Sequence, residues 1–205
     1  NKDVKKGEKG EYRLRLFLKK YAENNSMIFL DVSHDKEYQK MDIDFIISDN
    51  KEKFAIELKT DSYDSGNMFF EELSSIETHS IGCFLRTKAN ILLYYFEKTE
   101  DVYVFYDIQK FRDWYENNKN SFRHCKIKNK GYGSSIYNAY GGLVPLVQLN
   151  KAMRENKFGI KLNFLSNTPT ELIEGIRLTV PFSADENIVV SNKTKVKPIF
   201  RSCRQ

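Results

Sequence analysis

Two strand-like runs joined by a short polar turn constrain the fold of this chain more than any other feature. Residues 41–48 and 53–60 are rich in Ile, Phe and Leu, and the turn between them is made of Asp, Asn, Lys and Glu. This pattern is typical of a β-hairpin. Yet Asp44 interrupts the first run, and Glu57 and Lys59 stand near the end of the second. A sheet built from these runs must therefore accommodate three charges.

The period of two along a β-strand predicts which way these side chains point. In the second run it places Phe54, Ile56 and Leu58 on one face, and Ala55, Glu57 and Lys59 on the other. In the first run it places Ile43, Phe45 and Ile47 on one face, and Asp42, Asp44 and Ile46 on the other. If the runs pair as a hairpin, Asp44 lies beside Glu57 and Lys59.

Two neighbouring carboxylates repel each other, and burial makes each charge costly unless it is paired or bound to a metal. A divalent cation removes this conflict, and oxygen ligands with room for water suit Mg²⁺ or Mn²⁺. Two alternatives stay open. Glu57 and Lys59 could form an ordinary ion pair on a solvated face, and Asp44 could cap a turn while Asp42 is the ligand.

The N-terminal segment predicts a helix over residues 2–24. Its apolar stripe follows steps of three and four through Val4, Gly7, Glu11, Leu14, Leu18 and Tyr21. Glu11 stands where a leucine is expected, which predicts a carboxylate facing the sheet. The alternative is that Glu11 extends to solvent from the edge of the stripe.

The remaining pattern predicts an α/β fold with a mixed central sheet flanked by helices. Strands are expected at 27–33, 89–98 and 101–108, with short strands or an extended arm at 159–166, 175–182 and 187–191. Helices are expected at 108–122 and 143–156, and a loop at 61–73 leads into a further helix. Polar loops are expected at 34–40 and 128–142. No nucleotide-binding glycine motif is present.

The distribution of charge favours a polyanionic partner. Residues 117–154 and 187–205 contain no Asp or Glu, although both segments are basic and the chain's net charge is only +5. Such asymmetry is typical of a nucleic-acid contact, and the alternative is a solvated basic surface. The candidate contacts are Lys126, Lys128, Lys130 and Tyr132, with the three lysines on one face if the segment is a strand.

Composition excludes several other classes of protein. The three cysteines are scattered, which favours a reducing compartment over a disulfide framework. His34, His79 and His124 lack metal-ligand spacing and are interpreted as structural. No apolar run is long enough to span a membrane and no secretory segment is apparent, so we expect a cytoplasmic protein of prokaryotic or phage type.

The motif order resembles the PD-(D/E)xK nuclease superfamily. Asp44, followed after twelve residues by Glu57-Leu58-Lys59, matches the motif that names it, although Ile43 stands where its Pro is expected. Gly7 and Glu11 are similar to the first-helix G-x-x-x-E of many members, including archaeal Holliday junction resolvases. Residues 59–72 and 82–96 are similar to the segments that follow in phage and bacterial nucleases of this type. The resemblance covers residues 5–115.

The resemblance implies a restriction-endonuclease-like fold and a Mg²⁺-dependent DNA endonuclease in which Mn²⁺ can substitute. Asp44, Glu57 and the carbonyl of Leu58 would hold the metal, and Lys59 would orient the attacking water. Glu11 would act through a water or a second metal. The supporting residues would be Asn67 and Glu71, for which a loop turn and a helix start are the alternatives.

The expected organisation is a nuclease core over residues 1–115 and a basic extension over 116–205. The extension either completes the same domain or forms a DNA-reading or dimer element. Duplex or branched DNA is the expected partner, and double-strand cutting favours a homodimer. The alternative functions are a non-catalytic DNA-binding module of the same fold, a Holliday junction resolvase rather than a restriction-type enzyme, and a structural or interaction protein.

Overall fold

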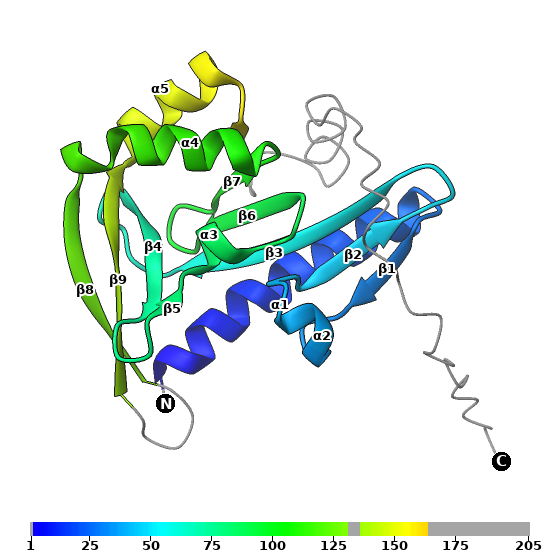
Figure 1. The fold of residues 1–205 in the computed structure, drawn as a ribbon. Helices are drawn as coiled ribbons and strands as arrows, with labels where there is room; N and C mark the ends of the chain where they lie inside the picture. Colours follow the sequence, from blue (N-terminus) through cyan, green and yellow to red (C-terminus); the bar gives the residue numbers. More distant parts are fainter. Residues whose placement is uncertain (1, 131–135, 164–205) are drawn as a thin grey trace, which may run out of the picture.

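The structure is a computed structural model that describes residues 2–130 and 136–163. Its central sheet has six strands in the order β1-β2-β3-β6-β7-β10 (Figure 1). These strands are β1 (Ile28–Asp31), β2 (Phe45–Ser48), β3 (Lys53–Asp61), β6 (Ile91–Phe96), β7 (Asp101–Phe105) and β10 (Gly159–Asn163). Only β3 and β6 run parallel among these neighbours, so the predicted mixed α/β sheet is confirmed.

A second sheet lies beside the central one and has the order β5-β4-β9-β8 (Figure 1). Its strands are β4 (Asn67–Ser75), β5 (Ser80–Ile81), β8 (Arg123–Lys130) and β9 (Ile136–Pro145). The chain passes through β4, β5 and the short helix α3 (Cys83–Arg86) between β3 and β6. A parallel pair needs such a crossover because its strands cannot be joined by a tight turn. The crossover therefore carries part of the second sheet across to the face of the first.

Helices and the second sheet cover the two faces of the central sheet separately. α1 (Lys2–Asn24) packs on one face through Leu14, Leu18 and Tyr21 against Ile56 and Leu58 of β3. The opposite face is covered by α4 (Ile108–Asn118), the short 3-10 turn η1 (Lys119–Ser121), α5 (Leu146–Asn156), α3 and the second sheet. Within the described residues, no helix is long and apolar enough to cross a membrane.

The structure corrects two expectations about the second sheet. The helix expected after residues 61–73 is wrong, because β4 runs through this segment with Met68 and Phe70 fully buried. The loop expected at 128–142 is wrong as well, since β8 and β9 pair across most of it. Glycine ordinarily weakens a strand, but here it is required by close packing. A Cβ at Gly141 would lie 1.9 Å from the carbonyl oxygen of Phe70.

Two smaller differences lie before β2. The expected loop at 34–40 contains α2 (Lys36–Gln39), whose N-cap Asp35 accepts a hydrogen bond from the amide of Glu37. Ile43 was expected on the face of Phe45, but it joins the cluster of Ile46 on the other face. The reason is local, because Asp42 has a left-handed φ of 48° and the strand begins only at Phe45. Strand alternation therefore does not extend back to Ile43.

Candidate active site

The hairpin of β2 and β3 places two carboxyl groups side by side. The strands pair antiparallel with Phe45 opposite Ile56, which confirms the predicted hairpin. The amide of Asp44 donates to the carbonyl of Ile56 at 2.9 Å, and Asp44 Oδ2 accepts from the amide of Leu58 at 2.8 Å. Both contacts fix the Asp44 carboxyl against the segment that carries Glu57.

Glu57 is buried on the face of the sheet opposite α1. Its side chain is only 4% exposed. Its neighbour Ala55 belongs to the apolar cluster around Ile46, and the adjacent strand β6 contributes Leu92 and Tyr94 to the larger cluster beneath α4. The carboxyl therefore lies between two apolar clusters, and alternation predicted this face correctly.

Burial changes the proton affinity of both carboxyl groups. It raises the pKa of Glu57 to about 8, with Lys59 opposing the shift and Asp44 adding to it. Burial also raises the pKa of Asp44. Two hydrogen bonds, one from the Leu58 amide and one from the Glu57 carboxyl, lower this pKa and oppose the effect of burial. Because Glu57 must be protonated to donate that bond, the pair holds a proton near neutral pH.

Lys59 places an ammonium at the mouth of this pair. Its Nζ lies 3.4 Å from Glu57 Oε1, and its side chain is 39% exposed while that of Glu57 is buried. Cys83 first, then Glu57 and Glu71, raise the pKa of Lys59 against the opposing effect of burial. Burial raises the pKa of the Cys83 thiol to about 12, so at neutral pH the thiol is uncharged and the charge shared by the carboxyl pair attracts the ammonium. Lys59 therefore stays charged.

The second sheet brings Glu71 to the same place. Glu71 Oε2 accepts a hydrogen bond from the amide of Cys83 at 3.3 Å, at the start of α3. The approach is close because a Cβ at Gly82 would lie 2.0 Å from the carbonyl oxygen of Glu71. Asn67, the other predicted supporting residue, begins β4 and bonds its side-chain amide to the carbonyl of Ser65 at 2.8 Å. The structure thus brings Glu71, but not Asn67, into contact with the residues around the pair.

The donor set fits a hard divalent cation that keeps most of its water ligands. Across residues 2–130 and 136–163, no three His, Cys, Asp or Glu side chains are grouped closely enough to hold a metal ion. Mg²⁺, however, is commonly bound through one or two carboxylates and several waters. Asp44 and Glu57 supply two carboxyl groups, and the raised pKa of Glu57 is what a metal-binding carboxyl has when only protons are available.

The structure places Glu11 differently from the prediction. Its side chain is exposed, so the interpretation that Glu11 faces the sheet is wrong. The buried stripe of α1 runs through Leu14, Leu18 and Tyr21 and packs on the face opposite Glu57. The preceding residue, Gly10, is buried against Thr60 and Glu97. Glu11 is the next position around the helix, so its side chain points away from the core.

The lysines of β8 lie on the other face of the second sheet from Glu71. Lys126 pairs with Tyr140 of β9, and Tyr140 lies on the same face as Gly142, two positions further along. Gly142 pairs with Phe70 of β4, so Lys126 and Phe70 share this face. Glu71 follows Phe70 and therefore points to the opposite face. Lys128 shares the face of Lys126, and both are exposed. Lys130 ends β8, and the predicted contact Tyr132 lies outside the described residues. The predicted basic face therefore exists on β8 for Lys126 and Lys128, but it does not face the carboxyl pair.

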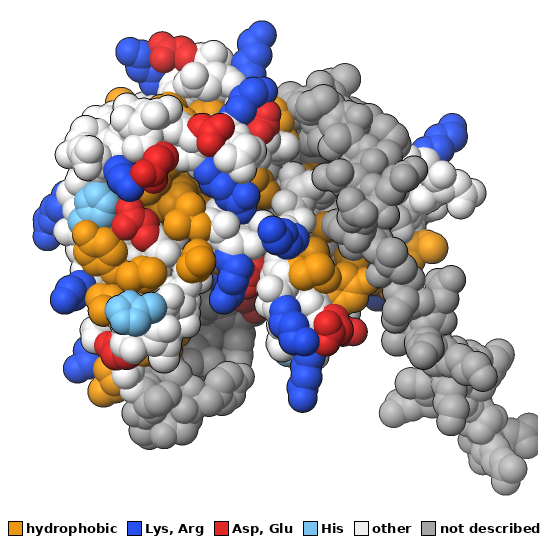
Figure 2. Space-filling view, in the orientation of Figure 1, with side chains coloured by type: hydrophobic (Ala, Val, Ile, Leu, Met, Phe, Trp, Pro, Cys, Tyr) orange, Lys and Arg blue, Asp and Glu red, His pale blue; other side chains and the backbone are white. Residues whose placement is uncertain are grey.

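Sequence analysis missed the residues that α3 contributes. Arg86 donates two hydrogen bonds to Asp42, from Nε and from Nη2, both at 2.6 Å. The hydrogen bond to Asp42 raises the pKa of Arg86, and the charge of Asp42 also adds to the raised pKa of Glu57. Figure 2 shows Lys and Arg side chains gathered around a hollow in the middle of this face. No spacing in the sequence could have linked Arg86 to Asp42, because they are 44 positions apart.

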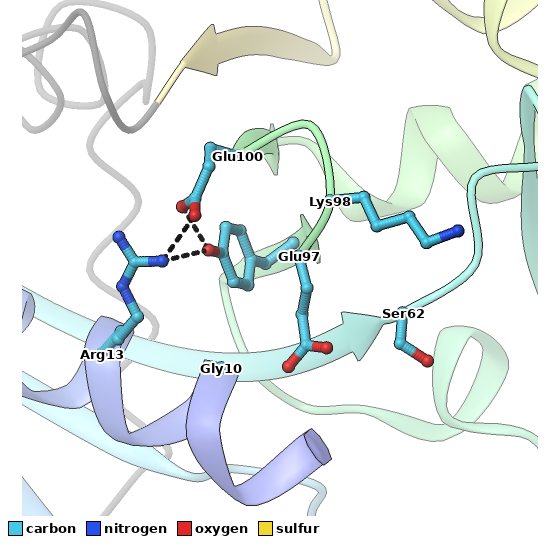
Figure 3. A pocket seen from close by; sticks show the side chains of 7 residues that line it. Gly10, Arg13, Ser62, Glu97, Lys98 and Glu100 are labelled. Carbon is cyan, nitrogen blue, oxygen red and sulfur yellow. Dashed lines mark hydrogen bonds and ion pairs between the residues drawn. The ribbon is translucent and has the colours of Figure 1, made fainter. Parts of the chain in front are cut away.

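The structure has another pocket, of about 300 Å³, beside α1 (Figure 3). Arg13 donates to Glu100 at 2.5 Å and to the hydroxyl of Tyr95 at 3.2 Å. The lining also includes Glu97 and Lys98, so its formal charges balance. Tyr95 packs in the cluster beneath α1, which puts this pocket on the face away from Glu57. It is therefore separate from the candidate active site.

His124 has a structural environment. His124 Nε2 lies 3.1 Å from Glu72 Oε1, and the same oxygen accepts from the hydroxyl of Tyr115 at 2.8 Å. The His124 ring stacks on Tyr140 with centroids 5.5 Å apart. This network joins β8, β4 and α4, as the structural interpretation of His124 requires.

Comparison with known proteins identifies no relative. No protein-family model, no curated protein and no solved structure matches the chain. The functional argument therefore depends on the residues themselves.

Proposed function

We propose that this chain is a Mg²⁺-dependent DNA endonuclease with a restriction-endonuclease-like core. One observation carries the proposal: a buried carboxyl, Glu57, lies beside the half-buried carboxyl of Asp44 and a partly exposed lysine on the β2–β3 hairpin. A structural ion pair does not require the second carboxyl, since Glu57 has to keep a proton or bind a cation in order to lie buried beside Asp44. The arrangement is favourable if a cation and a substrate phosphate complete it.

Each residue then has a defined role. Asp44, Glu57 and the carbonyl of Leu58 would hold Mg²⁺, for which Mn²⁺ can substitute. Bound there, the metal would lower the pKa of a coordinated water and neutralise charge on the phosphate. Lys59, exposed at the mouth of the pair, donates to the attacking oxygen and stabilises negative charge that develops on the phosphate. Glu71 holds the start of α3 beside Lys59. Glu11 receives no role, because it is exposed on α1.

The proposed substrate is duplex or branched DNA. Lys59 beside the carboxyl pair and Arg86 of α3 are both partly exposed cations, and they favour a phosphate backbone. We assign the nearest phosphate contacts to the residues around α3. Lys126 and Lys128 point away from Glu71 and are proposed to contact DNA farther along the duplex. The chain is proposed to act inside a prokaryotic or phage-infected cell.

The first experiment compares cleavage of supercoiled plasmid and of a four-way junction, in millimolar Mg²⁺ and in EDTA. We expect metal-dependent cutting that is reduced at least about a hundredfold in Lys59→Ala, because an electrostatic stabiliser at a reacting centre contributes on that scale. The matched control is Lys20→Ala, which removes an exposed lysine from α1. Preferential cutting of the junction would favour a resolvase over a restriction-type enzyme.

The alternative proposal is a DNA-binding module of the same fold. It predicts DNA binding without cutting of either substrate, and equal binding by Lys59→Ala and the wild type. Cleavage that persists in EDTA, or that Lys59→Ala retains in full, would overturn the proposed mechanism. Absence of both binding and cutting would instead favour a structural protein whose charges are ion pairs.

A further inference from the structure

The ion pair between Arg86 and Asp42 is unusual in its geometry. Arg86 uses Nε and Nη2 to hold both oxygens of Asp42, each at 2.6 Å. The Asp42 side chain is 11% exposed, whereas that of Arg86 is 44% exposed. The carboxylate is thus enclosed while one edge of the guanidinium faces solvent.

The backbone around this pair is fixed by further bonds between the same two segments. Thr87 Oγ1 donates to the carbonyl of Asp42 at 2.7 Å, and the amide of Lys88 donates to the carbonyl of Met41 at 2.8 Å. Arg112 of α4 also holds α3 by donating to the carbonyls of Phe84 and Thr87. The guanidinium is therefore held rigidly against Asp42, which stands two residues before Asp44 in the chain.

Arg86 retains unused hydrogen-bond donors at its exposed edge. A guanidinium carries five N–H groups, and among the described residues Asp42 takes two of them. Both N–H groups of Nη1 are left for another acceptor. Arginine held in this way loses little conformational entropy when it binds, and its planar fork matches phosphate geometry.

We propose that Arg86 binds a backbone phosphate of the DNA next to the scissile one, and that Asp42 holds its guanidinium ready for that contact. This inference rests on the proposed function, because it assigns a substrate contact to the same site. It makes Arg86 a substrate-binding residue and Asp42 a positioning residue. The rival interpretation is that the pair only braces α3 against the start of β2.

The two interpretations differ in the salt dependence of DNA binding. A phosphate contact releases a counterion, so its loss lowers the slope of log affinity against log salt by about 1. A purely structural pair changes stability but leaves the slope unchanged. The experiment measures binding of a short fluorescent duplex in EDTA, between about 50 and 200 mM salt.

The variants are Arg86→Gln, Asp42→Asn and a matched control, Arg15→Gln. Arg15 also pairs with an aspartate, Asp31 at 3.1 Å, and its side chain is 42% exposed, but it lies on α1. We expect Arg86→Gln to lose about tenfold in affinity, as a charged hydrogen bond contributes, and about one unit of slope. Asp42→Asn is expected to keep the wild-type slope, because the guanidinium remains. Arg15→Gln is expected to change neither affinity nor slope.

Each outcome is decisive for the inference. Equal slopes for Arg86→Gln and the wild type would overturn the phosphate contact while leaving the nuclease proposal intact. If the salt slope falls as much in Arg15→Gln as in Arg86→Gln, the change is a general effect of net charge. That result would also overturn the phosphate contact of Arg86. If the wild type shows no salt-dependent binding, both the inference and the proposed DNA substrate fail. Thermal melting of each variant accompanies the titration, because Arg86→Gln could unfold α3. Arg86→Lys supplies a second measurement, because this variant keeps the positive charge.

Discussion

At the scale of single residues, the proton on Glu57 connects the site to the stability of the whole chain. Its pKa is raised from 4.5 to about 8, mainly by burial. Between these values the folded state binds a proton that the unfolded state has released. Stability therefore falls as pH rises through this window, and the loss is complete only above pH 8.

This sign leads to a prediction for Glu57→Gln in metal-free buffer. The amide cannot ionise, so the variant is expected to be more stable than the wild type at pH 9 by about 2 to 5 kcal/mol, and similar to it near pH 4. Urea unfolding across this pH range measures the difference. The control is Glu23→Gln, which removes an exposed glutamate of α1. A constant difference between Glu57→Gln and the wild type at all pH values would contradict the raised pKa.

The same proton should be released when Mg²⁺ binds. A cation and a proton compete for the Glu57 carboxyl, so Mg²⁺ affinity is expected to rise by up to about tenfold per pH unit below pH 8, and then to level off. Calorimetry in two buffers of different ionisation enthalpy counts the released protons. Asp44→Asn is expected to weaken Mg²⁺ binding strongly. Binding that is independent of pH between 6 and 8 would place the metal elsewhere.

Sequence periodicity predicted the central residues of the site but not their surroundings. Alternation along β3 puts Glu57 and Lys59 on one face, and Asp44 meets them because it immediately precedes β2 and is hydrogen-bonded to Ile56 and Leu58 of β3. Arg86 and Glu71 reach the site through the crossover between β3 and β6, which no local pattern describes. The burial of Glu11 was predicted wrongly because Glu11 lies at the edge of the apolar stripe of α1. At such an edge, a shift of one position around the helix changes a side chain from buried to exposed.

At the scale of elements, the second sheet shows where packing overrides local preference. β4 looks like the start of a helix and β9 like a glycine-rich loop, yet they pair over six register positions. Phe70 of β4 stacks on Tyr115 with centroids 3.5 Å apart. Such contacts between distant elements decide the conformation, and they are invisible in a window of sequence.

Gly142 tests this packing. A Cβ there would lie 2.3 Å from the hydroxyl oxygen of Tyr115, so Gly142→Ala is expected to destabilise the chain by about 1 to 3 kcal/mol. Tyr115→Phe alone loses the bond to Glu72, which contributes about 1 kcal/mol. In the double variant the nearest obstacle is gone, so the two costs should not add. Strictly additive changes in a denaturant unfolding cycle would refute this close contact.

At the scale of the whole molecule, the described residues contain one such carboxyl pair, and this constrains how a duplex is cut. Under the proposed function one pair would hydrolyse one strand at a time, so double-strand cleavage would require either two copies or two successive events. We predict a homodimer as the form that linearises plasmid. Nicked circles should dominate at low protein concentration, and the linear product should rise more steeply than first order with concentration.

Mixing wild-type chains with inactive Glu57→Ala chains is expected to suppress linear product more than nicked product. Linear product that stays unchanged when the inactive chains are added to a fixed amount of wild type would instead indicate that each chain acts alone.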